Sequence, residues 1–255
     1  MLFNETIFGP IHSRRLGASL GVNLLPTTAK ICSFDCVYCE CGFNFTHEGA
    51  RVPTRIEVAE LLELKLQMLL SNKEPLDVIT FAGNGEPTLH PDFNSIIDDT
   101  IGLRNRYFPN AKVSVLSNST RIYKPEVFEA LLKVDNNILK LDSAISATAK
   151  LINQPNTPNF SIDETISQLE KFKGQLIIQT LFFSGDYNGH HIDNTTENEI
   201  IAWLAALKRI RPQHVMIYSL DRATPAKNLK KADAETLSAI AKRVEALGIA
   251  TQVTF

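Results

Sequence analysis

The feature of this sequence that most constrains its fold is a regular alternation of short apolar runs and amphipathic segments. The apolar runs have the length and composition of buried strands, and the segments between them have the period of helices. The strand-like runs are residues 19–25, 77–83, 112–118, 137–143, 175–183, 214–220 and 249–255. The helical segments are residues 54–70, 91–107, 124–133, 161–172, 196–210 and 233–248. This order predicts a parallel sheet whose strands are joined by right-handed helical crossovers.

The number of strand–helix units limits the architecture. Six predicted strands precede a helix and a seventh ends the chain, which is too few for the eight units of a complete barrel. We therefore expect an α/β fold with parallel strands in a partial (β/α)6, TIM-like barrel; an open doubly wound sheet is the alternative. The length of 255 residues suits a single domain over residues 1–255. Helix starts are marked by Thr54 with Glu57 and by Ser161 with Glu164, which have capping-box spacing.

Unusual polar motifs follow the predicted strands. They are the cysteine-rich stretch 30–42, "GNGEPTLHP" (83–91), "SNST" (117–120), "KLDS" (140–143), "SGDYNGHH" (184–191) and "SLDRATP" (219–225). In barrels and doubly wound sheets alike, the loops after the strands form the active face. The shared position of these motifs therefore predicts one composite site.

All four cysteines of the chain lie within ten positions, at Cys32, Cys36, Cys39 and Cys41. A zinc site usually needs two separated cysteine pairs, or one pair with histidines, and no second pair exists here. A tight loop with C-x3-C-x2-C spacing can hold three corners of a cubane iron–sulfur cluster and leave one iron for another ligand. Cys41 follows Cys39 too closely to reach a fourth corner, so we expect it not to be a ligand.

Composition excludes some functions. The formal net charge of −2 does not indicate a large non-specific nucleic-acid surface. No apolar run approaches the roughly 20 residues that cross a bilayer. The first residues also lack the basic and apolar regions of a signal peptide. We therefore expect no membrane association and a cytoplasmic, reducing location, where clustered thiols are more often metal ligands or catalysts than disulfides.

The stretch "CSFDCVYC" resembles the C-x3-C-x-aromatic-C signature of the radical S-adenosylmethionine (SAM) superfamily, with Tyr38 as the aromatic residue. The stretches "GPIHSRRLGASLGVN" and "GNGEPTLHP" are similar to those of a subgroup of stand-alone radical SAM core proteins, which resembles the radical enzymes of wybutosine synthesis on tRNA. The resemblance spans nearly the whole chain and implies a radical SAM core. It implies that Cys32, Cys36 and Cys39 bind a [4Fe-4S] cluster whose free iron chelates SAM.

The resemblance also implies a set of SAM-binding residues. Gly83, Asn84, Gly85 and Glu86 match the superfamily element that holds the methionyl amino group, with Asn84 in place of a glycine. Ser117, Asn118 and Asp142 are expected to contact the ribose or carboxylate of SAM, and Lys140 the SAM carboxylate or the substrate. The alternative for Lys140 and Asp142, which share one face of a strand, is a structural ion pair.

The implied activity is that of an oxidoreductase-type enzyme. It cleaves SAM reductively to a 5′-deoxyadenosyl radical, which abstracts hydrogen from an unidentified small-molecule, peptide or RNA substrate, with an electron donor such as flavodoxin or ferredoxin. The alternatives are an RNA- or tRNA-modifying radical enzyme and a non-catalytic iron–sulfur protein. The wybutosine enzymes use a second cluster, which this chain cannot build alone because only Cys41 is left over.

Other polar residues have open interpretations. His190 and His191 either reach a substrate or form a solvated pair in a loop. Arg14 and Arg15 either grip a phosphate or carboxylate, or pair with acidic residues. Gln179 and residues 218–222 end two strands and are candidate contacts of adenosine or substrate.

Overall fold

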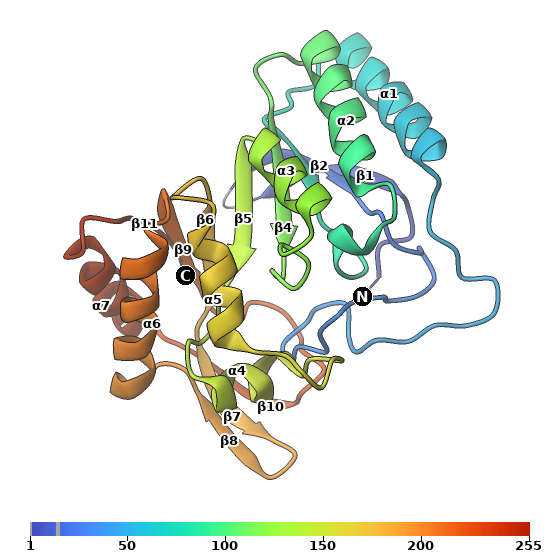
Figure 1. Cartoon of the computed structure of the whole chain (residues 1–255). Helices are drawn as coiled ribbons and strands as arrows, with labels where there is room; N and C mark the ends of the chain where they lie inside the picture. Colours follow the sequence, from blue (N-terminus) through green and yellow to red (C-terminus); the bar gives the residue numbers. More distant parts are fainter. Residues whose placement is uncertain (1, 14–15) are drawn as a thin grey trace. The chain divides into compact units, whose positions relative to one another are not determined.

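The computed structural model describes residues 2–13 and 16–255, so Arg14 and Arg15 lie outside the described residues. The chain forms two compact units (Figure 1). The first contains residues 1–32, 44–117 and 121–137, and the second contains residues 33–43, 118–120 and 138–255. A single domain over residues 1–255 stays a prediction.

The first unit is built from a strand series covered by helices. Its strands are β1 (Ile7–Ser13), β2 (Gly17–Val22), β3 (Val78–Phe81) and β4 (Lys112–Ser117), and its helices are α1 (Arg55–Asn72), η1 (Pro87–Leu89), α2 (Phe93–Tyr107) and α3 (Pro125–Lys133). The strands are ordered β1-β2-β3-β4, with β1 antiparallel to β2 and the later pairs parallel. The register aligns Ser19 with Val78 and Val78 with Lys112. The parallel part agrees with the sequence prediction.

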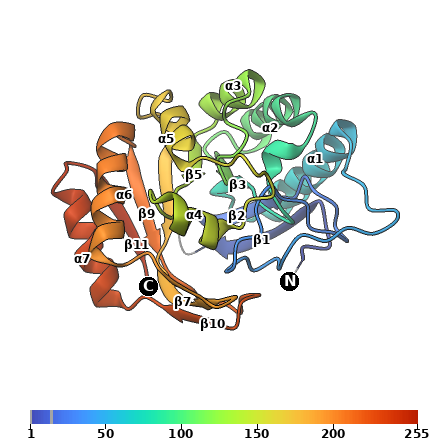
Figure 2. The ribbon, with the colours of Figure 1, turned by 60° about the horizontal axis from the view of Figure 1, so that its bottom comes forward.

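The core of the first unit lies between β3 and the helices. Every residue of β3 is buried. Helix α1 buries Val58, Leu62, Leu66 and Leu69, whose spacing of three or four residues forms one helical face. Helices α1 and α2 lie side by side, as Figure 1 and Figure 2 both show.

The second unit continues the alternation of strands and helices. Its parallel strands are β5 (Asn136–Lys140, which enters the unit at residue 138), β6 (Ile177–Leu181), β9 (His214–Tyr218) and β11 (Ala250–Thr254), in the order β5-β6-β9-β11. Its helices are α4 (Ser146–Asn153), α5 (Ile162–Glu170), α6 (Glu197–Ile210) and α7 (Ala234–Glu245). A small antiparallel sheet, ordered β10-β7-β8, is formed by β7 (Phe183–Tyr187), β8 (His190–Asp193) and β10 (Asn228–Lys231).

A hydrophobic cluster in the second unit packs against the cysteine loop, of which residues 33–43 lie in this unit. Its buried members are Val37, Ile152, Leu181, Phe183, Ile192 and Ala226. Val37 lies between Cys36 and Cys39 and is completely buried. The loop that carries the thiols is therefore fixed by core packing rather than left on the surface.

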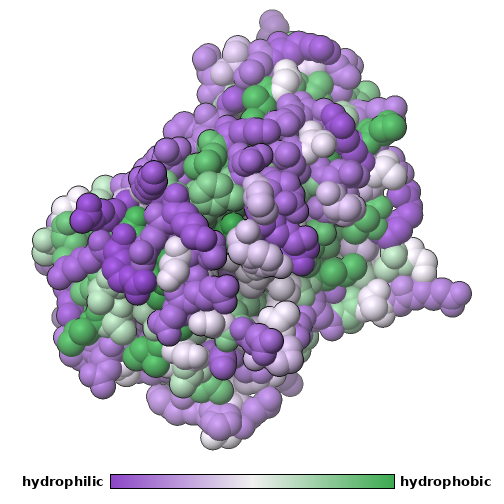
Figure 3. Space-filling view, viewed as in Figure 1, coloured by the Kyte–Doolittle hydropathy of each residue, from purple (hydrophilic) through white to green (hydrophobic). Residues whose placement is uncertain are grey.

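The face in Figure 3 is mostly hydrophilic, with hydrophobic residues scattered over it in small groups. Among the described residues, no helix is both long enough and apolar enough to cross a membrane.

Candidate functional site

The cysteine loop in the second unit is held by the C-terminal end of α4. The N–H groups of Asp35 and Val37 donate to the carbonyls of Asn153 and Ile152, both at 3.0 Å. These carbonyls belong to the last turn of α4 and have no partner within the helix. Cys39 N–H donates to Cys36 O at 3.0 Å, so Cys36 and Cys39 lie on one tight turn.

Cys32 belongs to the first unit, where Asn44 fixes its backbone. Cys32 N–H donates to Asn44 Oδ1 at 2.6 Å, and Asn44 Nδ2 donates back to Cys32 O at 3.1 Å. The preceding residue, Ile31, donates its N–H to Asn84 O at 3.0 Å and accepts from Glu86 N–H at 3.2 Å. The segment that leads into Cys32 is therefore hydrogen-bonded to the "GNGE" loop.

A buried cation contacts the Cys36 sulfur in the second unit. Lys140 Nζ lies 2.8 Å from Cys36 Sγ and 3.1 Å from Asp142 Oδ2. Asp142 Oδ2 also accepts the hydroxyl of Tyr38 at 2.6 Å, and Asp142 Oδ1 accepts Leu181 N–H at 3.1 Å. Two residues that the sequence placed on one strand face thus form an ion pair.

Burial and charge set the protonation states of this group. Burial raises the pKa of Cys36, although the Lys140 charge opposes the shift. Burial also raises the pKa of Tyr38, and the Asp142 carboxylate adds to the effect. Burial lowers the pKa of Lys140, but the Asp142 carboxylate and the contact with Cys36 outweigh it and the net shift is upward. Lys140 is therefore an ammonium and Tyr38 a neutral phenol that donates to Asp142.

The backbone of the "GNGE" loop requires its glycines. Gly85 has a φ of +140°, and a Cβ there would overlap the carbonyl of Ile31. A Cβ on Gly83 would overlap the side chain of Asn23. Asn84 is fully buried, and its amide bonds the backbone of Phe3 and Pro26. Its side chain therefore links the "GNGE" loop to two other segments of the first unit.

Glu86 is a buried carboxylate at the end of this loop, with 2% of its surface exposed. Its Oε1 accepts from Thr88 N–H at 3.1 Å, from the Thr88 hydroxyl at 2.6 Å and from the Ser117 hydroxyl at 2.9 Å. These donors fix the orientation of the carboxylate. Two predicted residues, Glu86 and Ser117, are thus brought together in the first unit.

Asn118 has a different setting from its neighbour Ser117. It lies in the second unit, where its Nδ2 donates to Ser33 Oγ at 2.8 Å and its Oδ1 accepts from Thr120. Asn118 therefore supports the start of the cysteine loop. Gln179 is aligned with Lys140 in the β5–β6 register.

Three supporting residues were absent from the sequence prediction. Asn44 fastens Cys32, Ser33 binds Asn118, and Asn153 Oδ1 accepts the Cys36 thiol at 3.6 Å. No motif marks Asn44 or Asn153, because each acts through contacts with residues distant in sequence. The predicted site residues divide between the two units, so a single composite site stays a prediction.

The donor chemistry of the loop fits a thiophilic metal cluster. Cys36 and Cys39 share one turn, and the Lys140 ammonium lies where it would offset the negative charge of a ligating sulfur. Cys41 lies half-buried in the same loop. Within residues 2–13 and 16–255, no three His, Cys, Asp or Glu side chains are already gathered as a metal site.

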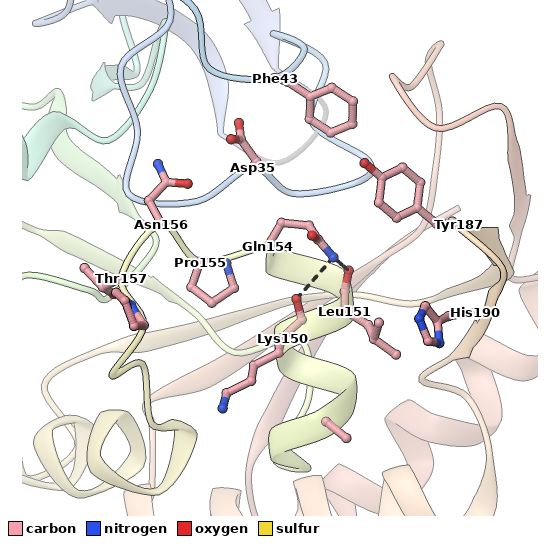
Figure 4. Close-up of a pocket in the computed structure, with 12 residues that line it drawn as sticks. Asp35, Phe43, Lys150, Leu151, Gln154, Pro155, Asn156, Thr157, Tyr187 and His190 are labelled. Carbon is pink, nitrogen blue, oxygen red and sulfur yellow. Dashed lines mark hydrogen bonds between the residues drawn. The ribbon is translucent and has the colours of Figure 1, made fainter.

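The second unit also contains a pocket of about 890 Å³ beside the cysteine loop (Figure 4). It is lined by Asp35, Phe43, Ala147, Lys150, Leu151, Gln154, Pro155, Asn156, Thr157, Pro158, Tyr187 and His190. The rings of Phe43 and Tyr187 lie 6.1 Å apart at one side. Gln154 Nε2 donates to Leu151 O at 2.8 Å. His190 lines the pocket, whereas the neighbouring His191 pairs with Asp186 at 2.9 Å.

Comparison with protein families gives one match. The model of the family described as "Radical SAM superfamily" matches residues 27–162. This range contains the cysteine loop, the "GNGE" loop, Ser117, Lys140 and Asp142.

Curated relatives cover the chain almost completely. A protein of Brachyspira hyodysenteriae named GTPase Obg is 30% identical over 249 residues, which is 96% of this chain and 34% of that protein. Further relatives, all named UPF0026 proteins, are 27% to 31% identical. The chain thus spans about a third of the first relative and 69% to 94% of the others.

Solved structures share the fold. A radical SAM methyltransferase from Sphaerobacter thermophilus matches 92% of this chain, and the match covers 65% of that protein, with a TM-score of 0.67 and 14% identity. TYW1 with a bound lysine–pyruvate adduct matches 89% of this chain and 73% of its own, with a TM-score of 0.60 and 14% identity. The predicted α/β fold with parallel strands in a partial barrel is thereby confirmed.

Proposed function

Because this chain belongs to the radical SAM superfamily, and is therefore an enzyme of the radical SAM class, we propose that Cys32, Cys36 and Cys39 hold a [4Fe-4S] cluster with SAM on its free iron. When bound, the cluster supplies the electron that cleaves SAM to a 5′-deoxyadenosyl radical, which abstracts hydrogen from the substrate. The observation that carries the proposal is the family match across both the cysteine loop and the "GNGE" loop.

In the first unit, Glu86 binds the methionyl ammonium of SAM. A buried carboxylate whose orientation is fixed by Thr88 and Ser117 is a strong acceptor for a cationic amine. Gly83 and Gly85 let the backbone approach the ligand without a Cβ in the way. Asn84 contributes through its backbone, since its side chain bonds Phe3 and Pro26.

In the second unit, Tyr38 and Asp142 form a wall of the cofactor site. Asn118 joins them, since it bonds Ser33 at the start of the cysteine loop. The buried hydrophobic cluster that includes Val37 helps to keep water away from Cys36, which is buried. Asp142 and Ser117 or Asn118 remain our proposed contacts of the ribose or carboxylate of SAM, and Lys140 remains a proposed contact of the SAM carboxylate or the substrate.

We propose that the pocket beside the cysteine loop receives the substrate. The loop itself forms one wall through Asp35 and Phe43, so a molecule in the pocket lies next to the segment that carries Cys36 and Cys39. The lining combines aromatic rings with amide, hydroxyl and imidazole groups, which suits a polar substrate. A soluble electron donor such as flavodoxin or ferredoxin, and a cytoplasmic location, complete the proposal.

An RNA substrate is the second candidate. The resemblance of the sequence motifs to those of the radical enzymes of wybutosine synthesis on tRNA favours it. The formal net charge of −2 and the single spare cysteine, Cys41, favour a different substrate and a different reaction.

Anaerobic reconstitution with iron and sulfide tests the proposal. We expect about four irons per chain, as in a [4Fe-4S] cluster, and 5′-deoxyadenosine after addition of SAM and dithionite. Alanine variants of Cys32, Cys36 and Cys39 lose the cluster, whereas Cys41→Ala, the matched control from the same loop, retains it. A wild-type protein that binds no cluster, or a loaded protein that forms no 5′-deoxyadenosine, would overturn the proposal. Loss of the cluster in Cys41→Ala would overturn the ligand assignment.

A further inference from the structure

The Lys140 ammonium contacts two aromatic rings in addition to its ion-pair partner, Asp142. Its side chain is only 13% exposed, and its Nζ contacts Asp142 Oδ2 at 3.1 Å. The same atom lies 4.8 Å from the ring centre of Tyr38 and 5.3 Å from that of Phe34. These rings flank the ammonium with their electron-rich faces.

The position of the ammonium depends on a chain of contacts behind it. Asp142 is itself fixed, because its Oδ2 accepts the Tyr38 hydroxyl and its Oδ1 accepts Leu181 N–H. Lys140 ends β5, so its backbone is part of the parallel sheet. The position of the lysine side chain is therefore restricted. The acceptor nearest to its Nζ is the sulfur of Cys36, at 2.8 Å.

We propose that Lys140 is a positioning residue that donates an N–H···S hydrogen bond to Cys36 as a cluster ligand and so raises the reduction potential of the cluster. The inference rests on the proposed function, since it assumes that Cys36 binds the cluster. It gives Lys140 a role that differs from binding the carboxylate of SAM.

The physical reason is electrostatic. Reduction adds one electron, supplied by an external one-electron reductant, to the cluster and its thiolate ligands. A cation that donates a hydrogen bond to a ligand sulfur stabilises the added negative charge. Hydrogen bonds to the sulfurs and local charge are among the factors that set the potential of an iron–sulfur cluster. In this buried setting water screens the Lys140 charge only weakly. Removing that charge therefore makes the cluster harder to reduce.

A redox titration of the SAM-free, reconstituted protein tests this role. We expect Lys140→Met to lower the ratio of reduced to oxidised cluster about tenfold at a fixed solution potential, which corresponds to about 59 mV for one electron. Lys140→Arg retains the charge and the N–H donors, so we expect its ratio of reduced to oxidised cluster to be close to that of the wild type. Lys208→Met, which removes an exposed lysine of α6, leaves the ratio unchanged.

A second measurement has its main readout in the wild-type protein. In wild-type protein labelled with ¹⁵N-lysine, pulsed electron paramagnetic resonance of the reduced, SAM-free cluster detects a weakly coupled ¹⁵N nucleus. The signal is absent in Lys140→Arg, whose replacement residue carries no label. Absence of ¹⁵N coupling in the wild type, or an unchanged redox ratio in a Lys140→Met protein with full iron content, overturns the inference. In either case a loaded wild-type protein that still cleaves SAM leaves the proposed function intact.

Discussion

At the scale of single residues, Glu86 makes the sharpest prediction about SAM. Glu86→Gln keeps the shape of the side chain and an oxygen for Thr88 and Ser117, but it removes the charge. A hydrogen bond to a charged group contributes roughly 1.5–3 kcal/mol, so we expect SAM to bind about 10- to 100-fold more weakly. Equilibrium dialysis with reconstituted protein measures this. Glu60→Gln, at an exposed glutamate of α1, is the control, and unchanged SAM affinity in Glu86→Gln would contradict the role.

Residue types and spacing predicted part of this chemistry. The spacing of Lys140 and Asp142 left two interpretations open, contacts of SAM or a structural ion pair, and the structure shows that the two side chains do pair. The contacts of SAM stay a prediction. The separate settings of Ser117 and Asn118 were not predictable, because adjacent residues at a strand end point in different directions. The contact between Lys140 and Cys36 joins residues 104 positions apart, and no local pattern encodes it.

At the scale of elements, the start of α1 tests whether local capping contributes to stability. Thr54 accepts Glu57 N–H at 3.2 Å while the Glu57 carboxylate accepts Thr54 N–H at 2.7 Å. We expect Thr54→Ala to destabilise the protein by about 1 kcal/mol, or roughly 2–4 °C in Tm for a chain of this size. Thermal unfolding measured by circular dichroism checks this. Ser71→Ala in the same helix should stay within about 0.5 kcal/mol of wild type; an equal loss in both variants would refute a capping effect.

Long periodic elements were predicted well, and short ones were missed. The helices α1, α2, α6 and α7 appear where the pattern placed them. Strand β1 was missed because Gly9 and Pro10 interrupt its pattern, and Pro is tolerated only at strand edges and bulges. The β7–β8 hairpin was treated as a loop, although Asn188 and Gly189 carry a hairpin turn signal and both have positive φ. The short helix α4, which holds the cysteine loop, also escaped prediction.

At the scale of the whole molecule, the chain divides its proposed functions between two units. The first contains Cys32 and the Glu86 loop, and the second contains Cys36, Cys39 and the pocket. In the first unit, Asn44 binds the backbone of Cys32 and Asn84 binds the backbone of Phe3. In the second unit, the last turn of α4 binds the loop that carries Cys36 and Cys39. The sequence motifs indicate the reaction class. The pocket was not predictable, because its walls come from a loop, a helix and a hairpin that only folding brings together.

The pocket makes the last prediction. Ala147 lies exposed on α4 and lines the pocket, so Ala147→Trp fills part of its volume without disturbing the core. If the pocket receives the substrate, cell extract stimulates 5′-deoxyadenosine formation by the wild type and by Ala147→Ser, while Ala147→Trp loses most of that stimulation. Chromatography of 5′-deoxyadenosine, normalised to the rate without extract, measures the effect. Pretreating the extract with ribonuclease or protease, or passing it through an ultrafilter, separates RNA, peptide and small-molecule substrates. Full stimulation of Ala147→Trp would contradict a substrate site at this wall of the pocket, because the ring takes up volume that the substrate would fill.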